Sequence, residues 1–182
     1  MRVIAGSAKS VPLRFPRGAR IRPTTDAMRE ALFSSLRDRT EGARFADVYA
    51  GCGSVGIEAL SRGAASCLFV EADRRCAAAL EANLSLTGLA GGARVAIGRA
   101  ERLWLALVEA HGPFDAVFAD PPYDLRGFSE FAERLVVGRE GVAPGGIVVV
   151  QYAARLGLPG LPEPTKLKRF GDSEILFYDN AP

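Results

Sequence analysis

The sequence of 182 residues is long enough for one domain with a complete hydrophobic core. Apolar residues make up 48% of it and charged residues 24%, which is typical of a soluble globular protein, and no apolar run has membrane-spanning length. Because a signal-peptide pattern is also missing, we expect a cytoplasmic protein without a membrane partner. Three cysteines without CxxC spacing and a single histidine argue against a disulfide framework, a bound metal, and Ser-His or Cys-His catalysis.

Positive charge is concentrated at the N-terminus. Residues 1–25 contain six basic residues and no acidic one, whereas the rest of the chain has 17 basic and 21 acidic residues. Two short runs of β type, 2–6 and 11–15, predict a small β-hairpin, and a loop follows over 16–23. A basic extension on a mildly acidic body favours a polyanionic partner. A solvated tail is the alternative, but the apolar residues between the charges indicate a folded segment.

The rest of the chain begins with a helix and then alternates between strands and helices. Thr24, Thr25 and Asp26 are N-cap candidates for the first helix, and we expect Arg29 to lie off its apolar face and to add positive charge. The later helices are predicted over 55–62, 74–86, 101–110 and 128–137, and the strands over 44–50, 66–70, 93–97, 114–119 and 146–152. This alternation specifies an α/β fold, a parallel sheet with helices on both faces.

The C-terminal part departs from the alternation. Residues 165–170 and 174–178 flank a short polar turn and predict an antiparallel hairpin. The expected architecture is therefore a seven-stranded, mostly parallel sheet that ends in this hairpin. We divide the chain into a basic extension over 1–24 and a main domain over 25–182.

A glycine-rich loop joins the first strand of the main domain to its helix. Gly51, Gly53 and Gly56 match the pattern G-x-G-x-x-G between a strand and a helix, and Glu71 ends the next strand 20 residues after Gly51. Glycines let a ligand approach the main chain, and a carboxylate at that place can accept hydrogen bonds from both hydroxyls of a ribose. The combination predicts a site for a nucleoside cofactor, either NAD or S-adenosylmethionine.

The sequence Asp120-Pro121-Pro122-Tyr123 distinguishes the two cofactors. It follows a buried strand, and the prolines end that strand and stiffen the turn. An acceptor carboxylate, a fixed carbonyl and an aromatic face can hold a planar ring that carries an amine. A dehydrogenase would instead need a proton donor or acceptor beside the nicotinamide, and no such set is evident. The residues therefore favour S-adenosylmethionine and an aromatic amine substrate over NAD.

These residues carry a family resemblance that covers nearly the whole chain. It includes Met1-Arg2-Val3-Ile4-Ala5-Gly6, Arg22-Pro23-Thr24-Thr25-Asp26, the glycine loop up to Gly63, Val70-Glu71, and Asp120-Pro121-Pro122-Tyr123. The chain resembles the Rossmann-like S-adenosylmethionine-dependent methyltransferases, and among them the RsmD-type enzymes that methylate the guanine N2 amine in 16S ribosomal RNA. Two departures concern Cys52, where the family usually has serine, and Arg99, where it often has an aspartate that reads adenine; Glu101 is a possible substitute.

The resemblance implies a role for each matching position. Catalysis would rest on Asp120 and the Pro121 carbonyl, which accept the amine hydrogens, and on Tyr123, which stacks on the base. The cofactor would contact Asp47, Ala50, Gly51, Gly53, Glu71, Ala72, Ala100 and Asp120. The RNA would contact Arg2, Lys9, Arg14, Arg20, Arg22, Thr24 and Arg29. The expected partner is 16S ribosomal RNA within a small-subunit particle, bound by a monomer whose extension over 1–24 contacts RNA.

Two alternatives remain open from the sequence. The protein could be another amine methyltransferase that acts on adenine N6 of a nucleic acid or on a protein glutamine. It could also be a non-catalytic RNA-binding protein on the same scaffold, although the presence of Asp120 and Glu71 argues against that.

Overall fold

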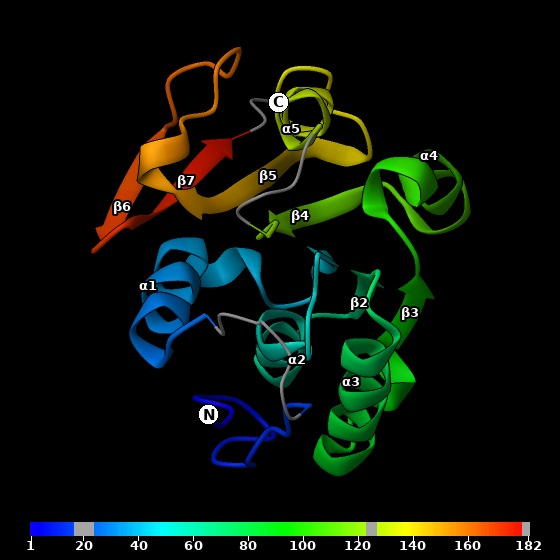
Figure 1. The fold of residues 1–182 in the computed structure, drawn as a ribbon. Helices are drawn as coiled ribbons and strands as arrows, with labels where there is room; N and C mark the ends of the chain where they lie inside the picture. The colour runs from blue at the N-terminus through cyan, green and yellow to red at the C-terminus, as the bar shows by residue number, and fades with distance from the viewer. Residues whose placement is uncertain (17–23, 123–126, 180–182) are drawn as a thin grey trace.

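A computed structural model describes residues 1–16, 24–122 and 127–179. Its core is one sheet of seven strands in the order β3-β2-β1-β4-β5-β7-β6 (Figure 1). The first five strands are parallel, and β7 is antiparallel to both of its neighbours. The strands are β1 (Arg44–Val48), β2 (Ser66–Glu71), β3 (Ala93–Ile97), β4 (Phe114–Ala119), β5 (Val142–Ala153), β6 (Lys166–Phe170) and β7 (Ser173–Asp179). The sheet confirms the expected Rossmann-like fold with its C-terminal antiparallel hairpin.

Helices cover both faces of the sheet, as expected. They are α1 (Asp26–Leu36), α2 (Ser54–Ser61), α3 (Arg74–Thr87), α4 (Ala100–His111) and α5 (Phe128–Val136). Buried side chains of α1, α2 and α3 share one core cluster with the sheet, and those of α4 and α5 share a second cluster on the opposite face (Figure 1). A parallel sheet covered in this way buries both faces of its strands, which explains their nearly continuous apolar sequences.

Side-chain alternation decides which residues of each strand reach which helices. In β4, Ala116 and Phe118 belong to the cluster of α1, α2 and α3, while Val117 and Ala119 belong to the other. Because successive side chains of a strand point to opposite faces, the next residue, Asp120, is directed toward the face that α1 covers.

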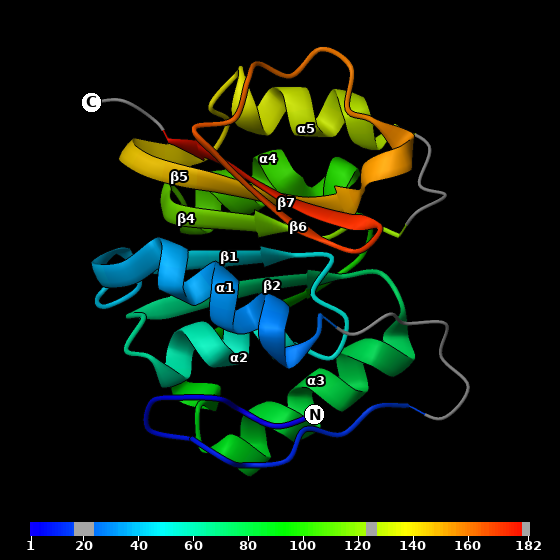
Figure 2. The same ribbon diagram turned by 90° about the vertical axis from the view of Figure 1, so that its left-hand side faces the viewer.

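The N-terminal segment is held together less regularly than the expected hairpin. Its two arms run antiparallel, with the Val3 N–H donating to the Val11 carbonyl at 3.0 Å and the Ser10 N–H donating to the Val3 carbonyl at 2.9 Å. The only bridge between them joins Arg2 to Pro12, so neither arm forms a regular strand. Pro12 has no N–H to extend the ladder. Val3, Ala8 and Leu13 nevertheless point into the core, and the segment runs along the outer side of α2 and α3 (Figure 2).

Two further observations complete the fold. β5 begins at Val142, four residues earlier than its apolar run suggests, because the pairing with β4 shifts register between Phe114 and Ala116 and Gly145 adopts a left-handed φ of 72°. Among the described residues, no helix is both long and apolar enough to cross a membrane.

Candidate functional site

The strand order places three motifs of the sequence side by side. β1 lies between β2 and β4, and its last residue, Val48, pairs with Val70 on one side and with Ala119 on the other. The carboxyl ends of these strands therefore carry the glycine loop, Glu71 and Asp120 at one edge of the sheet. The chain continues from β1 to β2 and β3 on one side of β1 and returns to β4 and β5 on the other side, so the strand order reverses at β1. Ligands of open α/β sheets bind at such a switch point.

The glycine loop is shaped by backbone conformations that favour glycine. Gly51 and Gly53 have φ values of 56° and 82°, and the Gly53 N–H donates to the Ala50 carbonyl at 2.8 Å. A Cβ atom on Gly53 would lie 2.2 Å from the Leu80 side chain. Tyr49 also has a positive φ, 65°, which is unusual for a bulky residue. The loop is thus a tight turn pressed against α3.

Glu71 is attached directly to this loop. One oxygen of its carboxylate, Oε2, accepts the Gly51 N–H at 2.7 Å, and the other, Oε1, accepts the Asp73 N–H at 2.7 Å. Each carboxylate oxygen has two lone-pair sites, so both retain the capacity to accept a further hydrogen bond. A half-buried carboxylate fixed in this orientation suits a ligand with two neighbouring hydroxyls, such as a ribose.

Asp47 supports the loop from beneath. Its side chain is 2% exposed, and its Oδ2 accepts the Gly56 N–H at 2.7 Å in the first turn of α2. Burial raises the pKa of Asp47 well above its usual value, and the nearby carboxylates of Asp120 and Glu71 act in the same direction. The structure thus gives Asp47 a supporting role, while its direct contact with a cofactor stays a prediction.

The next positions that the sequence predicts to contact a cofactor follow the ends of β2 and β3. Ala72 is exposed beyond Glu71, and Ala100 is buried at the start of α4. The Tyr49 hydroxyl donates to Glu101 Oε1 at 2.7 Å, and Arg99 Nε lies 3.5 Å from Glu101 Oε2. Burial and the hydrogen bond to Glu101 raise the pKa of Tyr49 above its usual value. Tyr49 went unrecognised in the sequence, where it falls inside the strand predicted over 44–50, whereas β1 ends at Val48.

Cys52 lies inside the loop as a structural residue. It is 3% exposed, and burial raises the pKa of its thiol to about 12, so the reactive thiolate is scarce at neutral pH. Its carbonyl accepts a hydrogen bond from Asn83 of α3 at 3.0 Å. These contacts identify Cys52 as a small residue accommodated in the glycine turn.

Within the described part of the chain, Asp120 receives two hydrogen bonds from side chains distant in sequence. The Gln151 side-chain amide donates to Asp120 Oδ2 at 2.9 Å, and the Thr24 hydroxyl donates to the same oxygen at 3.4 Å. Pro121 is buried beside it, whereas Tyr123 lies outside the described residues. Sequence reasoning missed Gln151. Its signal was a single polar residue after the apolar run 147–150 of β5.

Two positions expected to contact RNA face the interior instead. Thr24 is 5% exposed and turned toward Asp120, so the prediction of an RNA contact for its side chain is wrong. Arg29 is fully buried, and the same prediction is wrong for it. Its spacing to Leu32, Phe33 and Leu36 is that of one helix face, and this pattern identifies it as an inward residue of α1.

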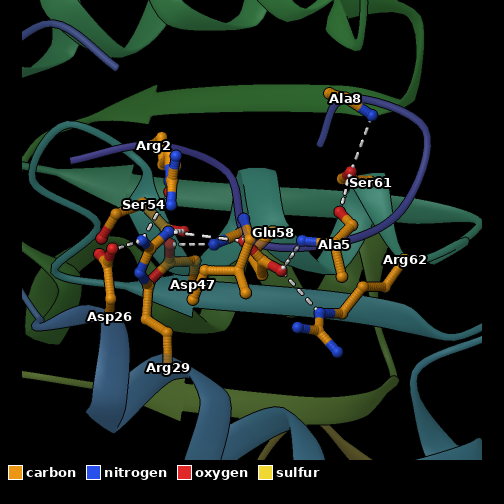
Figure 3. A network of polar contacts seen from close by, with 12 residues as sticks. Arg2, Ala5, Ala8, Asp26, Arg29, Asp47, Ser54, Glu58, Ser61 and Arg62 are labelled. Carbon is orange, nitrogen blue, oxygen red and sulfur yellow. Dashed lines mark hydrogen bonds and ion pairs between the residues drawn. The ribbon is translucent and has the colours of Figure 1, made fainter. Parts of the chain in front are cut away.

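Arg29 belongs to a buried network that fixes the N-terminal segment (Figure 3). Its guanidinium donates to the Arg2 carbonyl at 2.7 Å and to Asp26 at 2.8 Å, and it lies 3.5 Å from the Glu58 carboxylate. The fully buried Glu58 also accepts the main-chain N–H groups of Ile4 and Ala5 at 2.7 and 3.0 Å. Buried charges require such partners, so the network anchors the start of the chain to α1 and α2.

A second anchor lies where the N-terminal segment passes α3. The Asn83 side chain accepts the Arg14 N–H at 2.7 Å and donates to the Arg14 carbonyl at 3.0 Å. The same amide donates to Cys52, so one buried side chain joins the segment to the glycine loop. The side chains of Arg2, Lys9 and Arg14 remain exposed. Arg20 and Arg22 lie outside the described residues, and RNA contact at all five positions stays a prediction.

Comparison of the whole chain with known proteins identifies a family and several relatives. Residues 1–179 match the family described as Conserved hypothetical protein 95. The Ribosomal RNA small subunit methyltransferase D of Escherichia coli K12 is 36% identical over 169 residues, which cover 93% of this chain and 83% of that protein. The solved structure of yhhF from Escherichia coli is 34% identical, with a TM-score of 0.83 over 100% of this chain and 98% of that chain.

A more distant structure shares the fold. The RNA methyltransferase from Salinibacter ruber, solved in complex with S-adenosyl-L-homocysteine, has a TM-score of 0.66 at 17% identity over 88% of this chain and 94% of that one. Together with the family match over 1–179 and the relative of 36% identity, the comparisons show that the chain belongs to the family of RsmD-type methyltransferases.

Proposed function

We propose that this protein transfers a methyl group from S-adenosylmethionine to the exocyclic N2 amine of a guanine in 16S ribosomal RNA. The observation that carries the proposal is the placement of Glu71 and Asp120 on either side of the glycine loop, at the carboxyl ends of three adjacent strands. One carboxylate suits a ribose and the other suits an amine. The name of the relative from Escherichia coli K12, Ribosomal RNA small subunit methyltransferase D, supports the RNA substrate.

The residues present fit this cofactor. Glu71 would accept the ribose hydroxyls while it holds Gly51, and the exposed Ala72 and the start of α4 would flank the adenine. Glu101 is the acidic side chain of that region. Its Oε2 has no hydrogen bond among the described residues, although it lies 3.5 Å from Arg99 Nε. We assign it the readout of the adenine amine that the family's aspartate would supply at position 99. The bound cofactor supplies an already activated methyl group.

The protein's own residues then orient the acceptor. The lone pair of a guanine N2 amine is delocalised into the ring, so the amine is a weak nucleophile. Asp120 and the Pro121 carbonyl would accept hydrogen bonds from its two N–H groups and turn the lone pair toward the methyl carbon. The nitrogen would lose one of these protons as it gains the methyl group. Tyr123 would stack on the base. Orientation at a reactive distance of about 3–3.5 Å is then the main contribution to the rate.

The target base must leave its stack to reach Asp120, because a paired base cannot enter a site at a sheet edge. The exposed Arg2, Lys9 and Arg14 would contact phosphates beside such a base. The N-terminal segment is thus the proposed RNA-contacting extension of a domain that begins near residue 25. We propose a small-subunit particle as the substrate and a monomer as the active form.

The nucleoside product tests the proposal. The protein is incubated with labelled S-adenosylmethionine and small-subunit particles from cells that lack their own modification, and the RNA is digested to nucleosides. We expect labelled N2-methylguanosine, and none with Asp120→Ala. Labelled N6-methyladenosine or labelled protein would favour the other amine methyltransferases. RNA binding without any transfer would favour the non-catalytic alternative.

A further inference from the structure

The Asp120 carboxylate is held by two side chains to which no role in the reaction has been assigned. Gln151 of β5 and Thr24, just before α1, both donate to Oδ2, at 2.9 and 3.4 Å. They lie 31 and 96 residues from Asp120 in the sequence. Two donors on one oxygen fix the plane of the carboxylate, because rotation about its last bond would break both hydrogen bonds.

The sheet accounts for the convergence of these three residues. Ala119 of β4 pairs with Val150 of β5, so Asp120 and Gln151 follow at neighbouring positions of adjacent parallel strands. Ala119 and Val150 both belong to the cluster under α4 and α5, so the next residue of each strand is directed toward the face that α1 covers. Thr24 approaches from that face.

The side chain of Gln151 lowers the stability of the folded protein. It is 6% exposed, and its Oε1 is buried without a hydrogen-bond partner among the described residues. A buried acceptor without a partner destabilises a protein, and an apolar residue of the same shape would avoid the loss. An amide at this place fits a functional demand for its N–H group better than a demand for packing.

We propose that Gln151 and Thr24 are positioning residues that orient Asp120 for methyl transfer. Their hydrogen bonds fix the plane of the carboxylate that receives the incoming amine, so the lone pair of the amine points at the methyl carbon. The proposal rests on the proposed function, because it concerns the same amine and the same carboxylate. It adds that the Asp120 carboxylate is oriented by Gln151 of β5 and by Thr24, which precedes α1.

Variants that keep the shape of each side chain distinguish a role in orienting Asp120 from a role in stabilising the fold. Gln151→Met removes the donor and the unpartnered acceptor together, and Thr24→Val removes only the hydroxyl. We expect the single-turnover rate at saturating substrates to fall by about 10- to 100-fold in Gln151→Met. The cofactor KM should stay close to that of the parent, and the melting temperature should be equal or higher. Thr24→Val should lose rate, and Thr24→Ser, which keeps the hydroxyl, should recover it.

Thr40→Val is the matched control for Thr24. Thr40 is 4% exposed, its hydroxyl has no partner among the described residues, and it precedes β1 at the opposite end of the sheet. Its variant should keep the parental rate. A parental rate in Gln151→Met, or a melting temperature that falls in parallel with the rate, would overturn the inference.

The activity of the parent protein distinguishes a failure of this inference from a failure of the proposed function. Rates are measured on whatever RNA substrate the parent methylates. If the parent methylates an RNA other than ribosomal RNA, the proposed function fails and the variants still test this inference; if it methylates no RNA at all, both fail. If the parent is active and the donor variants match it, only the inference fails.

Discussion

Asp47 shows how a single buried carboxyl group can support the glycine loop. It accepts the Gly56 N–H at 2.7 Å and is almost inaccessible to solvent. Since burial raises its pKa well above the usual value, the folded protein holds this proton more tightly than the unfolded chain does. The resulting stabilisation is complete below the unfolded pKa of about 3.9 and is lost as the pH rises through the raised folded pKa.

Asp47→Asn should remove this pH dependence while keeping an acceptor for Gly56. Above about pH 4, the free energy of unfolding of the parent should fall relative to that of the variant by up to about 1.4 kcal/mol per pH unit. Urea unfolding between pH 4 and 8 measures both curves. Asp47→Ala, which lacks the acceptor, should follow the slope of the Asn variant at lower stability. Parallel curves for the parent and Asp47→Asn would contradict the assignment.

At the scale of elements, the N-terminal segment combines a fixed backbone with free basic side chains. Arg2 is held through its carbonyl by Arg29, and Arg14 is held through both main-chain groups by Asn83. Their side chains are exposed, as is that of Lys9. The charges can therefore be removed without loss of the anchors.

Neutralisation of Arg2, Lys9 and Arg14 to glutamine should weaken RNA binding and flatten its salt dependence. Each lost phosphate contact lowers the slope of log affinity against log salt by about 0.7–0.9. Binding assays at several salt concentrations measure the slope, and cofactor affinity should stay parental. The matched control replaces the exposed Arg37, Arg94 and Lys166, which lie outside the segment. Equal slopes in the two variants would show that RNA is held elsewhere.

At the scale of the whole molecule, Glu58 joins parts of the chain that are distant in sequence. It accepts hydrogen bonds from Ile4 and Ala5, pairs with Arg29 of α1 and receives the Arg62 guanidinium at 2.7 Å (Figure 3). Ser54 and Ser61 at the two ends of α2 add contacts to Arg29 and to the N-terminal segment. The segment is thereby part of the folded core.

Glu58→Gln should destabilise the protein strongly, because it removes the charge that the buried Arg29 and the half-buried Arg62 face, and it puts an amide N–H where donors already point. Loss of one partner of a buried ion pair costs about 3–5 kcal/mol. Urea unfolding gives the value. Glu81→Gln, at an exposed position of α3, is the control and should stay within about 0.5 kcal/mol of the parent. A similarly small effect at Glu58 would show that the network is dispensable.

The sequence by itself determined the order and type of the elements, and it predicted a cofactor site at the glycine loop. Alternating apolar runs predicted each strand and helix, since local periodicity reflects which faces are buried. The sequence could assign cofactor contacts to Gly51, Gly53 and Glu71. A strand, a glycine turn and a carboxylate at the end of the next strand occupy known relative positions in this type of fold. The role proposed for Asp120 was predicted in the same way, from its place before two prolines.

Only the tertiary structure decided which side chains support that site. Arg29, Thr24 and Gln151 are polar residues whose partners lie far away in the sequence, so no local pattern reveals whether they face solvent or the core. The fold places Thr24 and Gln151 against Asp120 and Arg29 against Glu58. A buried polar group is stable only beside a partner, and the sheet order and helix packing determine where partners meet.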